Sequence, residues 1–201
     1  MVSNETINVI KRNGRGKESL DIDKIHSMVG FATEGITGVS ASHVEMNSGL
    51  QFFDGISTDD IQQILIKSAN DLISLESPNY QYVAARLLLF SLRKSLHHRL
   101  WEHPKFLTHI KKLVDLGLYD KGILDNYTEA EIDRMGMWID HERDYNFTYA
   151  GLRQVMDKYL VQDRSTGEIF ETPQFMYMMI SATLFAKYPK ESRLQYVKKY
   201  Y

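Results

Sequence analysis

The N-terminal segment of the chain alternates apolar and polar residues for only a few positions before it reaches two cations and a turn. Residues 7–10 predict a short strand, and Asn13-Gly14 is a dipeptide typical of a tight turn between strands. A second short apolar run, Glu18 to Ile22, predicts the partner strand. Helical patterns follow at once, so the chain is expected to begin as a small β cap on a helical bundle.

Four cations come together around this predicted turn: Lys11, Arg12, Lys17 and Lys24. Positive side chains beside free backbone amides and a helix N-terminus form an anion site, and a nucleotide phosphate chain is the anion that we expect. A hairpin with no ligand is the alternative, because an Asn-Gly turn after a strand commonly does no more than connect two strands.

Four helices are predicted in the first hundred residues. The first runs from about Asp23 to Thr33 and the second from Ser40 to Leu50. The third opens at Ser57, where Asp60 three residues later resembles a capping box. The fourth starts at Ser77-Pro78 and is apolar almost all round, which is typical of a central, buried helix. The expected core positions of the first helix are Ile22, Ile25, Val29 and Ala32.

The helical pattern breaks between His97 and Pro104, and we place a domain boundary there, giving domains at residues 1–95 and 96–201. The three histidines of this stretch lack the acidic or cysteine partners of a known metal-site spacing. A polar linker around a buried Trp101 is therefore the prediction. Similarly, the charged run 140–144 is predicted to be solvated or ion-paired rather than catalytic.

Helices are also predicted in the second domain, together with one β-hairpin that has Gly167 in its turn. The predicted helices cover residues 106–116, a segment that starts near Thr128, and residues 150–159, 174–186 and 194–200. The last of them presents Leu194, Val197 and Tyr201 as an apolar face. This face either completes the domain's own core or packs against another polypeptide.

Composition excludes several classes of function. The chain has no cysteine, which excludes disulfides, thiol nucleophiles and cysteine-based zinc or redox sites within it. A formal net charge of -2 gives no reason to expect a nucleic-acid partner. There is no apolar run long enough to span a membrane and no signal peptide pattern, so a cytoplasmic protein is expected, in the host cytoplasm if it is viral.

Taken in order along the whole chain, these segments resemble the N-terminal part of the large subunit of class I ribonucleotide reductase, particularly the versions of enterobacteria and their tailed phages. The residues that carry the resemblance are 11–14, 23–26, 53–56, 78–86, 140–144, 158–161, 166–169 and 193–197, which read KRNG, DKIH, FDGI, PNYQYVAAR, DHERD, KYLV, TGEI and RLQYV.

The resemblance implies a mainly α fold in two parts. Residues 1–95 would form an ATP-cone, a small β cap on a four-helix bundle that binds ATP or dATP with Mg²⁺ as an allosteric effector. Residues 96–201 would form the helical N-terminal domain, with one β-hairpin, that packs beside the catalytic barrel. The family's catalytic and redox cysteines lie beyond this region, so no catalytic residue, no metal site and no redox cofactor is expected in this chain, and alone it should be inactive.

The resemblance also assigns nucleotide contacts, residue by residue. Lys11 and Lys24 correspond to phosphate-binding lysines, Asp21 lies near the ribose, and Thr58 stands where helix amides face phosphate. Lys94 corresponds to a cation that reaches the triphosphate. The complete set of expected contacts is Val9, Lys11, Arg12, Asn13, Gly14, Glu18, Asp21, Lys24, Thr58, Gln62 and Lys94.

Gln62 is a departure from the family pattern, because many members that dATP inhibits have histidine at this position. Glutamine can hydrogen-bond near the ribose, but its geometry and charge differ from those of histidine. We therefore hypothesise that nucleotide binding persists while inhibition by dATP is weakened or lost. The same departure favours a phage origin.

The resemblance implies three partners: the C-terminal catalytic part of the large subunit, the di-iron radical small subunit and the adenine nucleotide. The chain would be either a fragment or one piece of a naturally split subunit, of which we favour the second. The alternative function is a catalytically silent helical interaction domain with a non-functional cone. ATP-cone transcriptional repressors are disfavoured, because they carry a cysteine zinc ribbon.

Overall fold

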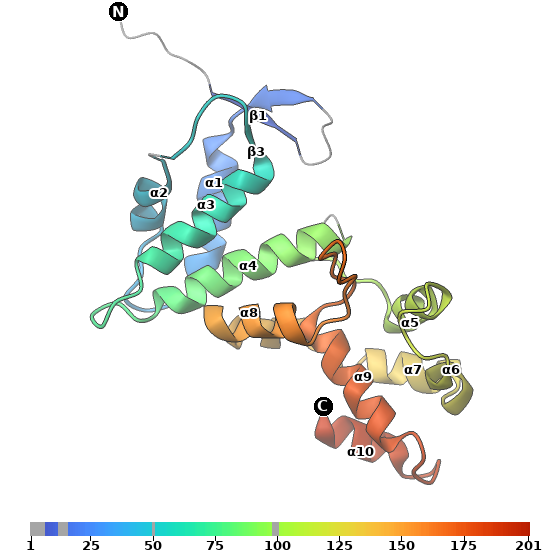
Figure 1. Cartoon of the computed structure of the whole chain (residues 1–201). Helices are drawn as coiled ribbons and strands as arrows, with labels where there is room; N and C mark the ends of the chain where they lie inside the picture. The colour runs from blue at the N-terminus through green and yellow to red at the C-terminus, as the bar shows by residue number, and fades with distance from the viewer. Residues whose placement is uncertain (1–6, 12–15, 50, 98–100) are drawn as a thin grey trace, which may run out of the picture. The chain divides into compact units, whose positions relative to one another are not determined.

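The computed structural model of the chain describes residues 7–11, 16–49, 51–97 and 101–201. The chain divides into two compact units, one formed by residues 1–91 with 145–152 and the other by residues 92–144 with 153–201. The division into domains 1–95 and 96–201 stays a prediction. In the structure, segment 145–152 is grouped with residues 1–91 rather than with the rest of the second half of the chain. The fold is mainly helical with one small sheet, which confirms the predicted fold class (Figure 1).

The sheet of the first unit has three short strands in the order β2-β1-β3. Strand β1 (Asn8–Ile10) pairs antiparallel with β2 (Lys17–Ser19), as the turn pattern predicted. Strand β3 (Ile56–Ser57) pairs parallel with β1, and nothing in its two residues predicted a strand. Because β3 runs directly into a helix, the sheet ties the N-terminus of the chain to a segment nearly fifty residues away.

The first unit contains helices α1 (Ile22–Thr33), α2 (Ala41–Gly49) and α3 (Thr58–Asp71), together with α4 (Tyr80–His97) as far as Ser91. Their boundaries are close to those that periodicity and capping predicted, and Ser57 caps α3 by accepting the Asp60 N–H at 3.0 Å. Ile25, Val29 and Ala32 are buried as expected. Ile22 is 69% exposed, so the prediction that it lies in the core is wrong. It is the first residue of α1, and the buried side of the helix begins one turn later, at Ile25.

The second unit is built from short helices. Its described elements are α5 (Phe106–Asp115), α6 (Gly122–Asn126), α7 (Glu129–Gly136), α9 (Pro173–Phe185) and α10 (Arg193–Tyr200), while the 3₁₀ helix η2 (His141–Asn146) and α8 (Tyr149–Lys158) cross from one unit to the other. Thr128 caps α7 in a complete capping box with Glu131, as its position before an acidic first turn predicted.

The apolar face of the last helix belongs to this unit's own core. Val197 is fully buried, and Leu194 and Tyr201 pack against the same cluster as Phe175 and Met178. Of the two alternatives that the sequence left open for this face, the structure therefore selects the domain's own core. The aromatic residues Tyr188, Tyr196 and Tyr200 remain exposed beside it.

The interior of the second unit also holds ion pairs. Arg93 donates to the backbone oxygen of His141 at 2.6 Å and lies 3.5 Å from the carboxylate of Asp144, whose other oxygen accepts from Gln174 at 2.7 Å. Arg193 pairs with Glu131 through both carboxylate oxygens at 2.7 Å. The charged run 140–144 is thus ion-paired, as predicted, but at Asp144 it is buried rather than solvated.

Two features of the predicted linker differ from the expectation. Trp101 is 55% exposed, so the prediction of a buried tryptophan is wrong. The half-buried ring in this stretch is His103, which stacks on His141 with ring centroids 3.6 Å apart. The large apolar area of a tryptophan favours its burial, which is why the sequence predicted a buried Trp101. The sequence did not indicate that the ring of His103 would stack on that of His141.

The predicted hairpin is present as a turn with a single bridge. Gln162 and Ile169 form an isolated antiparallel bridge, and Gly167 takes a φ of 75°, a left-handed conformation that glycine adopts without strain. Among the residues that the structure describes, no helix combines the length and the apolar character needed to cross a membrane.

Candidate functional site

The small sheet brings three segments of the first unit to one edge. Ile10, the last residue of β1, pairs with Lys17 at the start of β2 and with Ser57 at the end of β3. The residues that follow the two parallel strands, Lys11 and Thr58, therefore emerge beside each other, although 47 positions separate them. The Lys11 N–H donates to the Gly16 oxygen at 3.2 Å, which closes the hairpin at the same edge.

Two lysines and two carboxylates form an exposed charged cluster next to these strands. The Lys11 ammonium lies 2.8 Å from the Glu18 carboxylate, and the Lys24 ammonium lies 3.4 Å from that of Asp21. The hydrogen bond from Lys11 lowers the pKa of Glu18, and the positive charges of Lys11 and Lys24 act in the same direction. These four predicted site residues are thus brought together by the fold.

Helix α3 begins where a phosphate-facing helix would be expected. Thr58 is its first residue and Ser57 its N-cap, so the first turn of α3 lies directly beyond β3. Asp21 caps α1 in the same way that Ser57 caps α3, by accepting the Lys24 N–H at 3.2 Å. The helix dipole favours negative charge at such N-termini.

Four other predicted site residues are also described. Val9 is buried in the core and lies in the central strand of the sheet, between Glu18 of β2 and Ile56 of β3. Gln62 is buried as well, and its amide nitrogen donates to the Leu87 oxygen of α4 at 2.9 Å. Lys94 lies exposed in the last turns of α4, in the part of that helix that belongs to the second unit. Thr58 is half-buried.

The remaining three predicted residues, Arg12, Asn13 and Gly14, lie outside the described residues. One residue that supports the site was missed by sequence reasoning. Asp54 accepts hydrogen bonds from the backbone N–H of Asn8 at 2.8 Å and from its side-chain amide at 3.0 Å, which lowers the pKa of Asp54. These bonds fasten the loop before β3 to the start of β1. The Asp54-Gly55 turn was visible in the sequence, but its partner was not.

This arrangement can bind a polyanion that also carries hydroxyl groups. Two exposed ammonium groups can donate to phosphate oxygens, and such charge-assisted bonds are the strong ones. The neighbouring carboxylates can accept from hydroxyl groups of a sugar. Across the described parts of the chain, no three histidine or carboxylate side chains are placed to hold a metal ion.

Comparisons with known proteins match the same regions. Residues 7–95 match the ATP cone domain family, and residues 145–201 match the family described as ribonucleotide reductase, all-alpha domain.

Individual relatives extend the match over nearly the whole chain. Over 198 residues the chain is 50% identical to the ribonucleoside-diphosphate reductase subunit alpha of Haemophilus influenzae. Over the same length it is 48% identical to the ribonucleoside-diphosphate reductase 1 subunit alpha of Escherichia coli. It is 44% identical to the subunit alpha of Enterobacteria phage T4 over 197 residues. Each match covers 98% of the chain but only 26% of the relative, so the chain spans about a quarter of the length of these relatives.

Proposed function

Because the chain contains an ATP cone and an all-alpha domain of ribonucleotide reductase and is homologous to the N-terminal region of the reductase large subunit, we propose that it is the regulatory, nucleotide-binding part of such a subunit. In this proposal the cone binds ATP or dATP together with Mg²⁺. The reduction of ribonucleoside diphosphates takes place on the catalytic part of the subunit, which this chain does not contain.

The observation that carries the proposal is the charged cluster at the sheet. Lys11 and Lys24 approach it from two different elements, and the first turn of α3 opens at the same edge as Lys11. In the proposal, the two ammonium groups and the α3 amides bind the triphosphate, while Asp21 and Glu18 accept from the ribose. Val9, Arg12, Asn13, Gly14 and Lys94 are added from the family resemblance.

Titration of the 201-residue chain with MgATP and MgdATP by calorimetry tests this assignment. Lys11→Ala and Lys24→Ala are each expected to weaken binding by about tenfold or more, because each removes a charge-assisted contact with phosphate. The matched control is Lys67→Ala, since Lys67 is also an exposed lysine of the first unit in an ion pair, with Asp71 at 2.6 Å. It should leave the affinity unchanged.

The result that would contradict the proposal is the absence of nucleotide binding by a chain that is folded by circular dichroism. In that case the alternative of a silent interaction domain would stand. Equal loss of affinity in Lys11→Ala and Lys67→Ala would show instead that only the overall charge matters. Raising the ionic strength should weaken binding of the wild-type chain, because the contacts are exposed to solvent.

We further propose that dATP inhibits this reductase weakly or not at all. The Gln62 amide is hydrogen-bonded to Leu87, and a neutral amide replaces the histidine of many inhibitable members at the position expected near the ribose. The affinities for ATP and dATP should differ by less than about threefold, whereas Gln62→His should change that ratio. Inhibition of the assembled enzyme by micromolar dATP would contradict this part of the proposal.

The partners proposed from the family are the catalytic part of the large subunit and the di-iron radical small subunit. Occupancy of the cone would change how the subunits associate, with a coupling of about 1–3 kcal/mol, which is typical of allosteric proteins. Sedimentation of the reconstituted subunits with and without MgATP measures this coupling as a shift in the association constant.

A further inference from the structure

Arg86 of α4 contacts two other parts of the first unit. Its guanidinium donates to the Glu34 backbone oxygen at 2.6 Å, at the C-terminal end of α1. The same guanidinium lies over the ring of Tyr145, 5.4 Å from the ring centroid, and the Phe90 ring of α4 meets the Tyr145 ring edge-on at 6.3 Å. Segment 145–152 is grouped with the first unit, so all four residues belong to that unit. One side chain of α4 thus contacts both the end of α1 and this segment.

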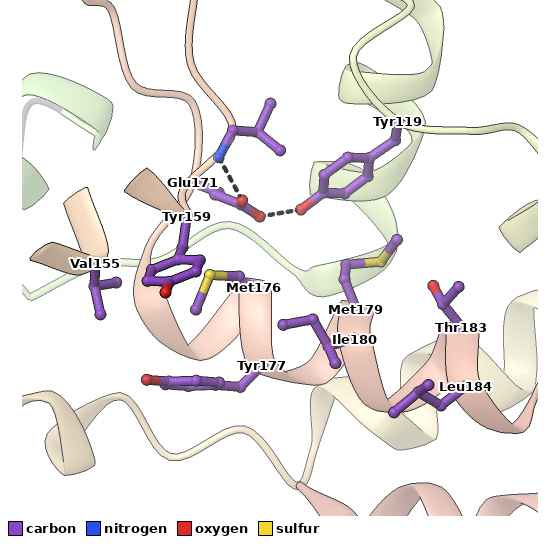
Figure 2. Close-up of a pocket in the computed structure, with 11 residues that line it drawn as sticks. Tyr119, Val155, Tyr159, Glu171, Met176, Tyr177, Met179, Ile180, Thr183 and Leu184 are labelled. Atoms are coloured by element: carbon purple, nitrogen blue, oxygen red, sulfur yellow. Dashed lines mark hydrogen bonds between the residues drawn. The ribbon is translucent and has the colours of Figure 1, made fainter. Parts of the chain in front are cut away.

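A buried polar side chain can serve packing alone, and Glu171 of the second unit is an example. Its carboxylate accepts from the Tyr119 hydroxyl and from the Val161 N–H at 2.7 Å (Figure 2). None of these three residues belongs to an element of the proposed nucleotide site. Arg86 differs from Glu171, because the helix whose end it holds carries Lys24 in its first turn.

Arg86 supplies a cation that the C-terminal end of α1 lacks. The last turn of α1 has no basic residue of its own, and its carbonyl groups carry the negative end of the helix dipole. A guanidinium that donates to a carbonyl oxygen there stabilises this end of the helix. At the opposite end the dipole favours an anion, which is where we propose that phosphate binds. With nucleotide bound, each end of α1 would face a charge of the sign that the dipole favours.

The second helix of the proposed site is bonded to the same part of α4. Gln62 of α3 donates to the Leu87 oxygen at 2.9 Å, and Leu87 directly follows Arg86 in the chain. Helices α1 and α3 are thus hydrogen-bonded to α4 at two consecutive residues. A change in the position of either helix on nucleotide binding would act on α4 where Tyr145 packs.

We propose that Arg86 is a positioning residue that couples nucleotide binding at the head of α1 to segment 145–152. This inference rests on the proposed function, since it concerns the regulation of that same nucleotide site. Bound nucleotide orders the first turn of α1 and Arg86 orders the last, so each reduces the entropic cost of the other. Coupling between two sites is reciprocal. Nucleotide should therefore hold Tyr145 more firmly, and Tyr145 should raise the affinity for nucleotide.

Direct contact does not account for such coupling. Helix α1 has 12 residues and is therefore about 18 Å long, with Lys24 near one end and the Arg86 contact at the other. The two coupled residues also belong to different family matches. Arg86 lies in the ATP cone match at residues 7–95, and Tyr145 is the first residue of the all-alpha domain match at residues 145–201. The coupling would extend the effect of nucleotide from the cone sequence to the start of the all-alpha sequence.

Hydrogen–deuterium exchange of the 201-residue chain, with and without saturating MgATP, tests the coupling. Residues 22–26 are expected to exchange more slowly with nucleotide bound, because they include part of the proposed site. Residues 145–152 should exchange at least threefold more slowly, although they contain no proposed nucleotide contact. In Arg86→Met the response of residues 145–152 should disappear while that of residues 22–26 remains. The matched control Arg153→Met removes an exposed arginine that pairs with Asp157 at 3.2 Å, and it should preserve both responses.

A double-mutant cycle separates coupling from a merely structural contribution. Arg86→Met and Tyr145→Leu should each weaken MgATP binding by about three- to tenfold in calorimetry. The double variant should bind no more weakly than Arg86→Met alone, because Tyr145 acts through Arg86. Tyr145→Leu does not remove the Arg86 donor to Glu34, so it tests the proposal even if Arg86→Met does not fold. The control Tyr159→Leu removes a tyrosine of α8 that is 62% exposed, and it should leave the affinity unchanged.

The proposal is overturned if MgATP slows exchange at residues 22–26 but not at residues 145–152, or if Arg86→Met leaves the response of residues 145–152 intact. Unchanged affinity in Tyr145→Leu, or additive losses in the double variant, would also overturn it. A folded chain that binds no MgATP would refute the proposed function and this inference with it. Nucleotide protection confined to the site refutes only the coupling, so the two failures are distinguishable.

Discussion

Two sets of charged groups, one in each unit, are in opposite environments. In the first unit Lys11, Glu18, Asp21 and Lys24 form ion pairs in solvent, with exposed side chains on both sides of each pair. In the second unit the guanidinium groups of Arg93 and Arg193 are each only 3% exposed and are held by Asp144 and Glu131.

This difference separates charges that are available to a ligand from charges that maintain the fold. An exposed ion pair contributes little to stability and can exchange its partner for a phosphate at small cost. A buried pair contributes little net stability either, but the loss of one partner leaves an uncompensated charge in the interior. Removing a charge should therefore change ligand affinity in the first unit and stability in the second.

The largest expected effect is the loss of a buried carboxylate. Asp144→Ala should lower the free energy of unfolding by about 3–5 kcal/mol, because the Arg93 guanidinium would remain buried without its carboxylate and Gln174 would lose an acceptor. Urea unfolding at pH 7.5 measures this through tryptophan fluorescence, since Trp101 and Trp138 are the chain's two tryptophans and both lie in the second unit.

The exposed counterpart in the same unit is Lys111→Ala, which removes the ion pair with Glu129. It should cost about 0–1 kcal/mol. If Asp144→Ala and Lys111→Ala lower the free energy of unfolding equally, burial does not determine how much an ion pair matters for stability.

The next effect concerns acid pH. Burial lowers the pKa of His103, His109 and His141 to about 3, from an ordinary value of 6.5. Between these values the unfolded chain binds protons that the folded chain does not, so stability is present above pH 6.5 and is lost as the pH falls. Burial raises the pKa of Asp144 to about 6, which offsets part of this loss. We expect a net decrease of about 3–4 kcal/mol between pH 6.5 and 5.

Unfolding at a series of pH values measures this decrease. His103→Phe should reduce this decrease by about 1–2 kcal/mol, because it removes one of the three titrating imidazoles. The His103 Nδ1 is buried without a hydrogen-bond partner, so the phenyl ring loses no hydrogen bond at that atom. A profile that is the same in the variant and the wild type would show that His103 does not titrate in this range. The first unit contributes none of these three histidines.

The smallest expected effect belongs to the exposed cluster. In the absence of nucleotide Glu18 holds the Lys11 ammonium, so Glu18→Gln should free that lysine and raise the affinity for MgATP by about two- to fivefold without a change in melting temperature. Calorimetry compares it with Glu45→Gln, which removes a carboxylate that pairs with His26 elsewhere in the same unit. The glutamine oxygen can still accept from the ribose, so weaker binding by Glu18→Gln would mean that this contact requires the charged carboxylate.

Local patterns predicted the elements on which the site is built. The Asn-Gly turn and the short apolar runs on either side of it gave the hairpin of β1 and β2, and Ser57 and Thr128 marked the starts of α3 and α7. These features depend on residues within a few positions of each other, and hydrogen bonding at a cap or a turn needs no distant partner.

Predictions failed where a side chain's environment is set by distant residues. Ile22 fits the helical repeat of α1 but lies at its exposed start, and Trp101 is apolar but exposed. The sequence did not predict the hydrogen-bond partners of Asp54, Asp144 and Glu171. Their partners Asn8, Gln174 and Tyr119 are 46, 30 and 52 positions away, distances over which no pattern in a single sequence indicates contact.

The sequence by itself therefore determined most of the helices, the caps at Ser57 and Thr128, the leading hairpin and the absence of any thiol for radical chemistry, since each follows from local spacing or from composition. Only the tertiary structure decided that β3 joins β1 in parallel and so places α3 beside Lys11. The physical reason is that strand pairing and burial are satisfied between segments far apart in the chain, where many partners are chemically acceptable and packing selects one.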